Sequence, residues 1–396
     1  MNCLSPYAAI NELRDQLLSE KRKIGFFLGA GTSMSIGIPG IDKLTNEIKK
    51  LLGKESLVLF NGIEKDCNVS NVEIILNRLR TYRELIGDNS EREYAGIKGK
   101  ENAQKLDSDI CSAISKIVQK DVDMKTTPHI VFSQWLKALS SERESPVELF
   151  TTNYDLFLER AMEQCAVPYF DGFVGAVQPF FAPEAVEAIN TNYDGQYFPP
   201  KGWTRLWKIH GSINWYIIKS PIDNSERISR ICSDYTNSTE LVIFPSREKY
   251  QQSRKLPFIA FQDRLRRFLS QGECLMIVLG YSYSDQHIND IIIQGLKSNP
   301  RLAVLSIQFE DATDIVKDIP KHNSRFTAYT RNRICIGGCD EEWSLIEEEK
   351  ANEIKDYYDD KNKHLSLGDF KVFAKFLNDQ FLTRFMYNDK KGSTRT

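Results

Sequence analysis

The chain has 396 residues, 41% of them hydrophobic and 27% charged, with a formal net charge of −2. This composition is typical of a globular protein with a sizeable core, and the charge balance argues against an extended basic surface for nucleic acid. No apolar stretch is long enough to span a bilayer, the N-terminal 23 residues lack an apolar signal core, and the 8 cysteines form no disulfide framework. We therefore expect a cytoplasmic protein with reduced thiols and no membrane contact.

The first informative element is an apolar run that ends in glycines. Residues 24–28 predict a buried strand, Gly29-Ala30-Gly31-Thr32-Ser33 follows it, and Gly37-Ile38-Pro39 comes shortly after. A strand, a glycine turn and a helix start together direct backbone N–H groups at a phosphate. The run has neither the third glycine of G-x-G-x-x-G nor the Gly-Lys-Ser/Thr of a Walker loop. It indicates a nucleotide site, and a purely structural turn is the alternative.

A long segment separates this turn from the next strand, and it exceeds the single helix that a parallel crossover needs. Helical spacing recurs in two apolar sets, namely Val72, Ile75, Leu76, Leu79 and Ile110, Ile114, Ile117, Val118. We predict a helical insertion over about residues 42–140. Its polar, glycine-containing stretch 87–105 is expected to be a mobile loop.

Three further strands end in polar motifs. They are 147–150 before Thr151-Thr152-Asn153-Tyr154-Asp155, 206–209 before His210-Gly211-Ser212, and 275–279 before Gly280-Tyr281-Ser282-Tyr283-Ser284-Asp285. An open α/β sheet binds its ligand at the carboxyl ends of its strands. Four motifs in such positions therefore predict one site. The irregular, proline-containing stretch 170–203 is interpreted as a packed surface loop or as a lid over that site.

The end of the chain changes character. Residues 302–309 are expected to form the last parallel strand of the sheet. Acidic residues follow at 347–349 and 359–360, and then come apolar side chains at helical spacing, namely Phe370, Phe373, Leu377, Phe381 and Phe385. This helix is predicted to pack on the parent domain or to form a subunit contact.

Four motifs of the chain resemble, in kind and in order, those of the NAD-binding domain of sirtuins. They are the glycine turn with Gly37-Ile38-Pro39, then Thr152-Asn153-Tyr154-Asp155, His210-Gly211-Ser212 and Gly280-Tyr281-Ser282. The resemblance spans about residues 20–310. It implies an α/β fold with a Rossmann-like parallel sheet, carrying the large helical insertion and a C-terminal helical extension. The expected domains are an NAD-binding and catalytic domain over residues 1–310 and an extension over residues 311–396.

Two departures separate the chain from protein-deacylating sirtuins. Those enzymes follow Gly-Ile-Pro with Asp-Phe-Arg, whereas this chain continues with Gly40-Ile41-Asp42. They also carry two Cys-x-x-Cys pairs that hold a zinc ion, and the nearest pair here, Cys335 with Cys339, has the wrong spacing. No zinc or other metal is expected. The chain looks most like zinc-less, sirtuin-like NAD hydrolases of bacterial antiphage defence, and among them like the stand-alone subunit that pairs with a HerA-type ATPase.

Asn153 and His210 are the predicted catalytic residues. An amide such as that of Asn153 can hold a ribose hydroxyl or orient water, and the matching sirtuin asparagine has such a role; the alternative is a cap for a helix starting at Tyr154. An imidazole such as that of His210 can accept a proton near neutral pH, whereas most lone histidines are structural. His287 follows the fourth motif and could lie near the pocket, and capping or packing explains it equally well.

The predicted NAD-binding residues flank this pair. Gly29, Ala30, Gly31, Thr32 and Ser33 are expected to cradle the pyrophosphate. Asp155 matches the sirtuin aspartate that recognises the nicotinamide carboxamide, although an aspartate in a first helical turn is also a common dipole partner. Gly280 and Ser282 match sirtuin residues that line the ribose and phosphate, and a tight turn is the alternative.

The resemblance implies a hydrolase that splits NAD, its substrate, into nicotinamide and ADP-ribose and causes abortive infection by depleting it. A deacylase or ADP-ribosyltransferase and a non-catalytic nucleotide-sensing subunit are the alternatives. A homo-oligomer and a HerA-type partner are expected. Direct nucleic-acid binding is not, because a solvated helix face accounts for the basic cluster Lys255, Arg264, Arg266 and Arg267.

Overall fold

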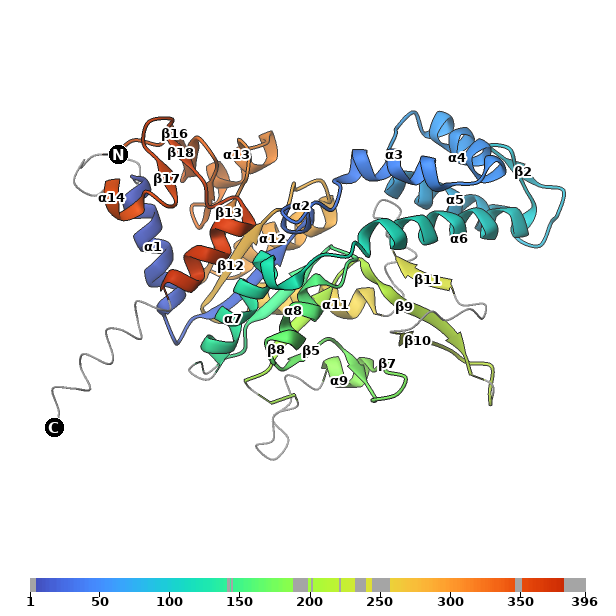
Figure 1. Cartoon of the computed structure of the whole chain (residues 1–396), viewed down its shortest axis with the longest axis horizontal. Helices are drawn as coiled ribbons and strands as arrows, with labels where there is room; N and C mark the ends of the chain where they lie inside the picture. Colours follow the sequence, from blue (N-terminus) through green and yellow to red (C-terminus); the bar gives the residue numbers. More distant parts are fainter. Residues whose placement is uncertain are drawn as a thin grey trace.

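A computed structural model gives the fold of the chain (Figure 1). It describes residues 5–140, 143, 145–187, 199–200, 202–220, 222–231, 240–243, 257–345 and 351–380. Within them the chain forms an α/β fold around a mostly parallel sheet, as the sequence predicts. Among these residues, no helix combines the length and the apolar character that crossing a bilayer requires.

The central sheet, within the described residues, has nine strands in the order β16-β15-β14-β13-β12-β1-β4-β8-β5. The strands from β14 to β5 pair in parallel, and β15 and β16 are antiparallel. Their bounds are β1 Lys23–Leu28, β4 Glu148–Thr151, β5 Tyr169–Phe170, β8 Thr204–Lys208, β12 Cys274–Leu279, β13 Leu302–Ile307, β14 Phe326–Tyr329, β15 Arg333–Ile336 and β16 Cys339–Glu342. Every residue of β4, β8 and β12 is buried, as expected of parallel strands with both faces covered.

Helices cover both faces of this sheet. One face packs against α1 (Pro6–Leu18), α7 (Pro128–Ser140) and a helix over residues 370–380. The other packs against α11 (Phe258–Ser270), α12 (Gln286–Ser298) and α13 (Asp314–His322). Successive residues of β1 alternate between the two cores, with Phe26 and Leu28 in the first and Phe27 in the second. The apolar run after Lys23 therefore anchors the middle of the sheet.

The predicted helical insertion has a core of its own. This core is built by α3 (Ile41–Leu51), α4 (Lys54–Cys67), α5 (Val72–Ile86) and α6 (Gly99–Val118), followed by the short helix η1 (Met124–Thr126). The last helix inside the predicted bounds of 42–140, α7, packs mainly on the central sheet. Figure 1 shows α3 to α6 at the opposite end of the molecule from β16 to β18. The expectation of a mobile loop over 87–105 is wrong. Residues 93–98 of this stretch form a hairpin of β2 (Glu93–Tyr94) and β3 (Ile97–Lys98), and α6 begins at the next residue, Gly99. Ile97 is buried and anchors that hairpin.

A second sheet lies beside the first, in the order β11-β9-β10-β7-β6 within the described residues. Its strands are β6 Phe173–Val174, β7 Phe180–Phe181, β9 Gly211–Lys219, β10 Glu226–Arg230 and β11 Glu240–Ile243. The described part of stretch 170–203 forms β6, β7 and α9 (Pro183–Glu187), and Phe173 and Phe181 pack in a core. This part is a packed segment, and residues 188–198 and 201 lie outside the described residues.

The sheet continues past residue 310. Residues 302–309 are not the last parallel strand, because β14 pairs in parallel with β13 and joins two antiparallel strands to the same sheet. The expected boundary at 310/311 thus falls between two neighbouring strands. Beyond them lie α14 (Ala351–Ile354), β17 (Tyr358–Asp359) and β18 (His364–Leu365).

The C-terminal aromatic helix packs on the parent domain over its described part. Phe370, Phe373 and Leu377 are buried in the same core as Phe26 of β1. The ring centroids of Phe26 and Phe373 are 6.2 Å apart. Phe381, Phe385 and the acidic residues 347–349 lie outside the described residues.

The arginines noted in the sequence do not gather into one surface patch. Arg264 is buried and pairs with Glu148 of β4, with 3.2 Å between Nη2 and Oε1. Arg266 pairs with Asp263 on the exposed side of α11 at 2.8 Å, and Lys255 lies outside the described residues. Arg264 therefore holds α11 against the sheet and presents no charge to a polyanion.

The loops after β1 and β12 meet through glycine backbone. A Cβ added to Gly31 would lie 2.7 Å from the Cα of Gly280, and one added to Gly29 would lie 2.4 Å from the Gly280 carbonyl oxygen. Gly280 also has a φ of +65°, which favours glycine. The N–H of Gly31 donates to that carbonyl at 2.8 Å. The close approach of the two loops therefore requires all three glycines.

Gly31→Ala should lower the free energy of unfolding by about 1–3 kcal/mol, because its methyl group would overlap the Gly280 backbone. Gly53→Ala is the matched control, since a Cβ there meets nothing within 4 Å; its cost at a helix N-cap should stay below about 1 kcal/mol. Urea unfolding of both variants measures the difference. Equal losses would contradict the packing argument.

A buried histidine on α7 makes the fold sensitive to acid. His129 lies against the rings of Phe157 and Phe370, and its Nδ1 has no hydrogen-bond partner among the residues that the structure describes. Burial lowers the pKa of His129 to about 3, well below its ordinary value near 6.5. Between these two values the unfolded chain binds a proton that the folded chain does not. The stability must therefore fall as the pH falls through this window.

His129→Leu should remove this dependence. We expect His129 to cost the wild type about 2 kcal/mol of its free energy of unfolding between pH 7 and pH 5. Urea unfolding at both pH values should show a loss smaller by that amount in the variant. His322→Gln, on the exposed end of α13, should behave as the wild type. The same pH dependence in His129→Leu and the wild type would refute the assignment.

Candidate functional site

Four strands end at one level of the sheet. Leu28 of β1 is in register with Thr151 of β4 and with Leu279 of β12, and Thr151 is in register with Lys208 of β8. The motif after β4 begins at Thr151 itself, and the other three motifs singled out in the sequence begin one or two residues past these positions. The structure thus brings them to the same edge of the sheet, where open α/β folds bind ligands.

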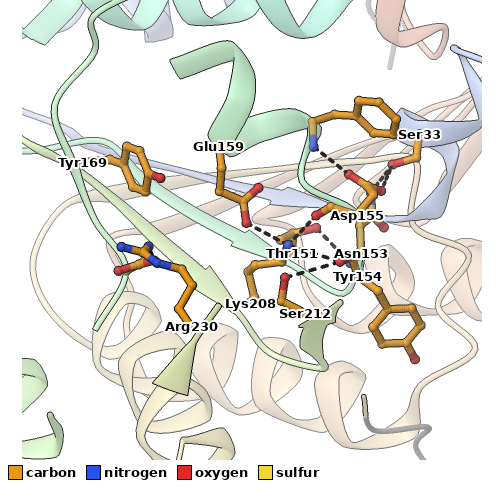
Figure 2. A network of polar contacts seen from close by, with 12 residues as sticks. Ser33, Thr151, Asn153, Tyr154, Asp155, Glu159, Tyr169, Lys208, Ser212 and Arg230 are labelled. Carbon is orange, nitrogen blue, oxygen red and sulfur yellow. Dashed lines mark hydrogen bonds and ion pairs between the residues drawn. The ribbon is translucent and has the colours of Figure 1, made fainter. Parts of the chain in front are cut away.

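Asn153 ties the loop after β4 to the glycine turn (Figure 2). Its Nδ2 lies 3.1 Å from the carbonyl oxygen of Gly29, 3.0 Å from Thr32 Oγ1 and 2.8 Å from Ser33 Oγ. Because the Gly29 carbonyl only accepts, this contact fixes which end of the amide faces the turn. The other end, Oδ1, has no hydrogen-bond partner in the described part of the chain. It is the atom of Asn153 left for a ligand.

Asp155 and Ser33 bind each other. Ser33 Oγ donates to Asp155 Oδ2 at 2.5 Å, and Asp155 Oδ1 accepts from the N–H of Phe157 at 3.1 Å. Asp155 therefore satisfies the first backbone N–H of α8 (Phe157–Gln164), just before its N-cap residue Leu156, whereas the sequence suggested an aspartate inside the first helical turn. The helix begins at Phe157 and not at Tyr154, so Asn153 is not its cap. Both Ser33 and Asp155 are buried, and their contact joins two of the four loops.

The glycine turn has already used part of its hydrogen-bonding capacity. Gly31 donates to Gly280, and the N–H of Thr32 donates to the carbonyl of Gly29 at 3.0 Å. Thr32 is buried and Ala30 is exposed at the start of the short helix α2 (Ala30–Met34). Ser282, also exposed, contacts Ser284 Oγ at 3.1 Å. Ala30 and Ser282 are thus the predicted contacts that face solvent at this edge.

His210 reaches across the sheet to the loop after β12. It follows β8, it is buried, and its Nε2 lies 3.1 Å from Asp285 Oδ2. In the sheet, β8 and β12 are separated by β4 and β1, a span of three interstrand spacings of about 4.8 Å each. The contact therefore passes over the ends of the two strands that carry Asn153 and the glycine turn. In the described part of the chain, His210 Nδ1 has no hydrogen-bond partner.

Asp285 is a site residue that sequence reasoning missed. It stands at the N-cap of α12, where its Oδ1 accepts from the N–H of His287 at 3.0 Å. An aspartate at a helix start has an ordinary explanation, so its second contact was not evident from the sequence. The available signal was its place at the end of the fourth motif. His287 meets the site through the backbone N–H of this cap.

A buried lysine supports the loop that carries Asn153. Lys208 is the one charged residue among 206–209, and its Nζ lies 2.8 Å from Glu159 Oε1 and contacts the carbonyl of Asp155. A buried charge is costly unless it is paired and hydrogen-bonded, and both partners are present here. Figure 2 shows Lys208 beneath the loop. A charge inside an apolar strand was the signal that the sequence offered.

Tyr154 links the same loop to two other parts of the molecule. Its carbonyl accepts from the N–H of Ile213 at 3.0 Å and from Ser212 Oγ at 3.3 Å, both on β9. Its hydroxyl donates to Glu73 Oε1 of the helical insertion at 2.9 Å. Burial, and then the nearby Glu73 carboxylate, raise the pKa of Tyr154 well above its ordinary range, so the phenol stays protonated and donates.

The predicted site residues thus fall into two linked groups. Gly29, Thr32, Ser33, Asn153 and Asp155 share one hydrogen-bonded network, which touches Gly31 and Gly280 through the backbone. His210 joins this assembly through Asp285, on the loop that follows Gly280 and Ser282. Among the described residues, no group of three or more His, Cys, Asp or Glu side chains could hold a metal ion.

Part of the chain is similar to known proteins. Residues 147–328, just under half of the chain, match the model of the SIR2-like domain. The structure of Sir2Tm bound to a propionylated peptide shares 14% identity, with 76% of this chain and 87% of that chain covered and a TM-score of 0.34. A structure on the mechanism and regulation of Sir2 enzymes shares 11%, with 77% and 87% covered and a TM-score of 0.35. No curated protein sequence matches the chain. The stretch that is similar to the SIR2-like domain holds Asn153, His210 and Asp285.

Proposed function

We propose that this protein is an NAD hydrolase, which cleaves the bond between nicotinamide and ribose and releases nicotinamide and ADP-ribose. The observation that carries the proposal is a pair of polar atoms past the strand ends, Oδ1 of Asn153 and Nδ1 of His210, which have no hydrogen-bond partner among the described residues and lie in the stretch that matches the SIR2-like domain. SIR2-like domains are associated with NAD chemistry. An accepting amide oxygen and a basic ring nitrogen suit a ribose and an attacking water.

The reaction does not require a general acid to protonate the leaving group. The nicotinamide of NAD is cationic, and it takes the electron pair of the breaking C1′–N bond and leaves neutral. The sugar carbon that remains resembles an oxocarbenium ion. A water oxygen forms the new bond to C1′, and the proton that this water loses passes to Nδ1 of His210 and then to solvent. Asn153 Oδ1 would accept from a ribose hydroxyl and hold the sugar.

The buried hydrogen-bond network around Asn153 shapes the loops at the proposed NAD site. Ser33, Asp155 and the amide nitrogen of Asn153 satisfy one another, so none of them needs NAD in order to stay buried. They set the shape of the loops, while Ala30 and Ser282 face the solvent side where phosphates would lie. The residues present therefore fit a dinucleotide, with fewer direct contacts than the motifs alone suggest.

The biological role that we propose follows from the likeness of the motifs to antiphage NAD hydrolases. Unregulated loss of NAD would kill the host cell, so the enzyme would be silent until a partner or infection activates it. A HerA-type ATPase is the proposed partner, with the chain acting in the cytoplasm as a homo-oligomer. Loss of NAD would then abort the infection.

Release of nicotinamide and ADP-ribose from NAD tests the proposal, with the full-length chain alone and mixed with a HerA-type ATPase. His210→Ala and Asn153→Ala should each lower turnover by about 10²-fold or more, since each removes one of the two open polar atoms. His322→Ala, on the exposed end of α13, should keep wild-type turnover. Thermal unfolding of each variant shows whether the fold is retained.

The outcomes separate the alternatives. NAD loss that requires an acyl-lysine peptide, or transfer of ADP-ribose to protein, would identify a deacylase or an ADP-ribosyltransferase. Stoichiometric NAD binding without nicotinamide release under either condition would identify a sensing subunit. Full turnover in His210→Ala would remove the histidine from the mechanism.

A further inference from the structure

The two carboxylate oxygens of Asp285 contact two different groups. Oδ1 accepts from the N–H of His287, which caps α12, and Oδ2 faces Nε2 of His210 at 3.1 Å. An ionised carboxylate only accepts hydrogen bonds, so the ring nitrogen facing it must carry a proton. This leaves Nδ1 as the nitrogen with a lone pair.

We infer that Asp285 is a positioning residue that fixes the protonation pattern of His210, with the proton on Nε2 and the basic lone pair on Nδ1. The inference rests on the proposed function for its kinetic part and on the contacts of Asp285 for its structural part. When Nδ1 takes a proton from the attacking water, the ring becomes a cation. The carboxylate on its other side stabilises that cation.

The N-cap contact of Asp285 predicts the orientation of an asparagine side chain placed at this position. In Asp285→Asn the amide has one accepting atom, its oxygen, and the N–H of His287 needs an acceptor at the cap. The oxygen should therefore stay at the cap, since an unpaired backbone donor costs free energy, and the NH2 group then faces His210. Two donors cannot face each other, so Nε2 must give up its proton and Nδ1 must carry it. The ring then has no lone pair on the catalytic side.

Asp285→Ser is the matched control. Serine is as good an N-cap as asparagine, and its shorter side chain leaves Nε2 of His210 unopposed. The ring remains free to keep its proton on Nε2. The less conservative substitution should therefore retain more activity, which is the reverse of what a purely structural role for the carboxylate predicts.

Steady-state kinetics with NAD provide the first test. For Asp285→Asn we expect kcat to fall by about 10²- to 10⁴-fold, and for Asp285→Ser by about tenfold. KM should change less than about threefold in both, because Asp285 acts through His210 and not on NAD. Asp285→Asn with turnover equal to or above that of Asp285→Ser would overturn the inference.

Nitrogen NMR of the full chain labelled with ¹⁵N-histidine provides the second test and needs no turnover. The chain has 5 histidines, and the His210→Gln spectrum identifies the signals of His210. We expect the proton on Nε2 in the wild type and on Nδ1 in Asp285→Asn. A wild-type proton on Nδ1, or an unchanged pattern in a folded Asp285→Asn, would overturn the inference. If no form hydrolyses NAD, the proposed function fails, while these spectra still decide the role of Asp285.

Discussion

The parallel pairing of β1 with β4 on one side and β12 on the other is the constraint on which the site depends. It sets the ends of three strands at one level, and the pairing of β4 with β8 adds the fourth. The loops then leave the sheet so close together that backbone meets backbone, as at Gly31 and Gly280. Gly29, Gly31 and Gly280 are thus required by the packing of the protein itself. A phosphate, where one binds, uses a surface that folding has already shaped.

Polar side chains hold these loops to one another and to the sheet. Lys208 and Glu159 form a buried ion pair beneath the loop that carries Asn153, and Ser33 and Asp155 join it to the glycine turn. Each of these groups would be costly to bury alone, so each holds its partner to one geometry. Tyr154 extends the same network to Glu73 of the helical insertion. The insertion is therefore connected to the candidate catalytic loop by a directional contact as well as by packing.

Much of the fold could be predicted because its signals are local. The run at 24–28, the strands that end at Thr151, Lys208 and Leu279, and the helical insertion all follow from apolar spacing and turn residues. The predictions that were wrong concern contacts between segments that are distant in the sequence, which no local pattern indicates. The hairpin at 93–98 depends on Ile97 reaching a core built by other helices, and β14 was missed because only its neighbour β13 makes it part of the sheet.

In the candidate site, too, local motifs indicated residues, whereas the contacts between distant residues were not evident from the sequence. The motifs located Asn153 and His210, but the partner of His210 is 75 residues away and stands at a helix start, where an aspartate needs no further explanation. Residue type alone also could not show that Ser33 and Asp155 bind each other, or that Arg264 is buried against Glu148. Hydrogen-bond accounting decides such cases. A buried polar group that is already satisfied shapes the site, and one with an open atom is available for chemistry. By that criterion the candidate chemistry narrows from ten predicted residues to two atoms, Oδ1 of Asn153 and Nδ1 of His210. Whether these two atoms act on a bound substrate is what separates the proposed enzyme from a protein that only holds a nucleotide.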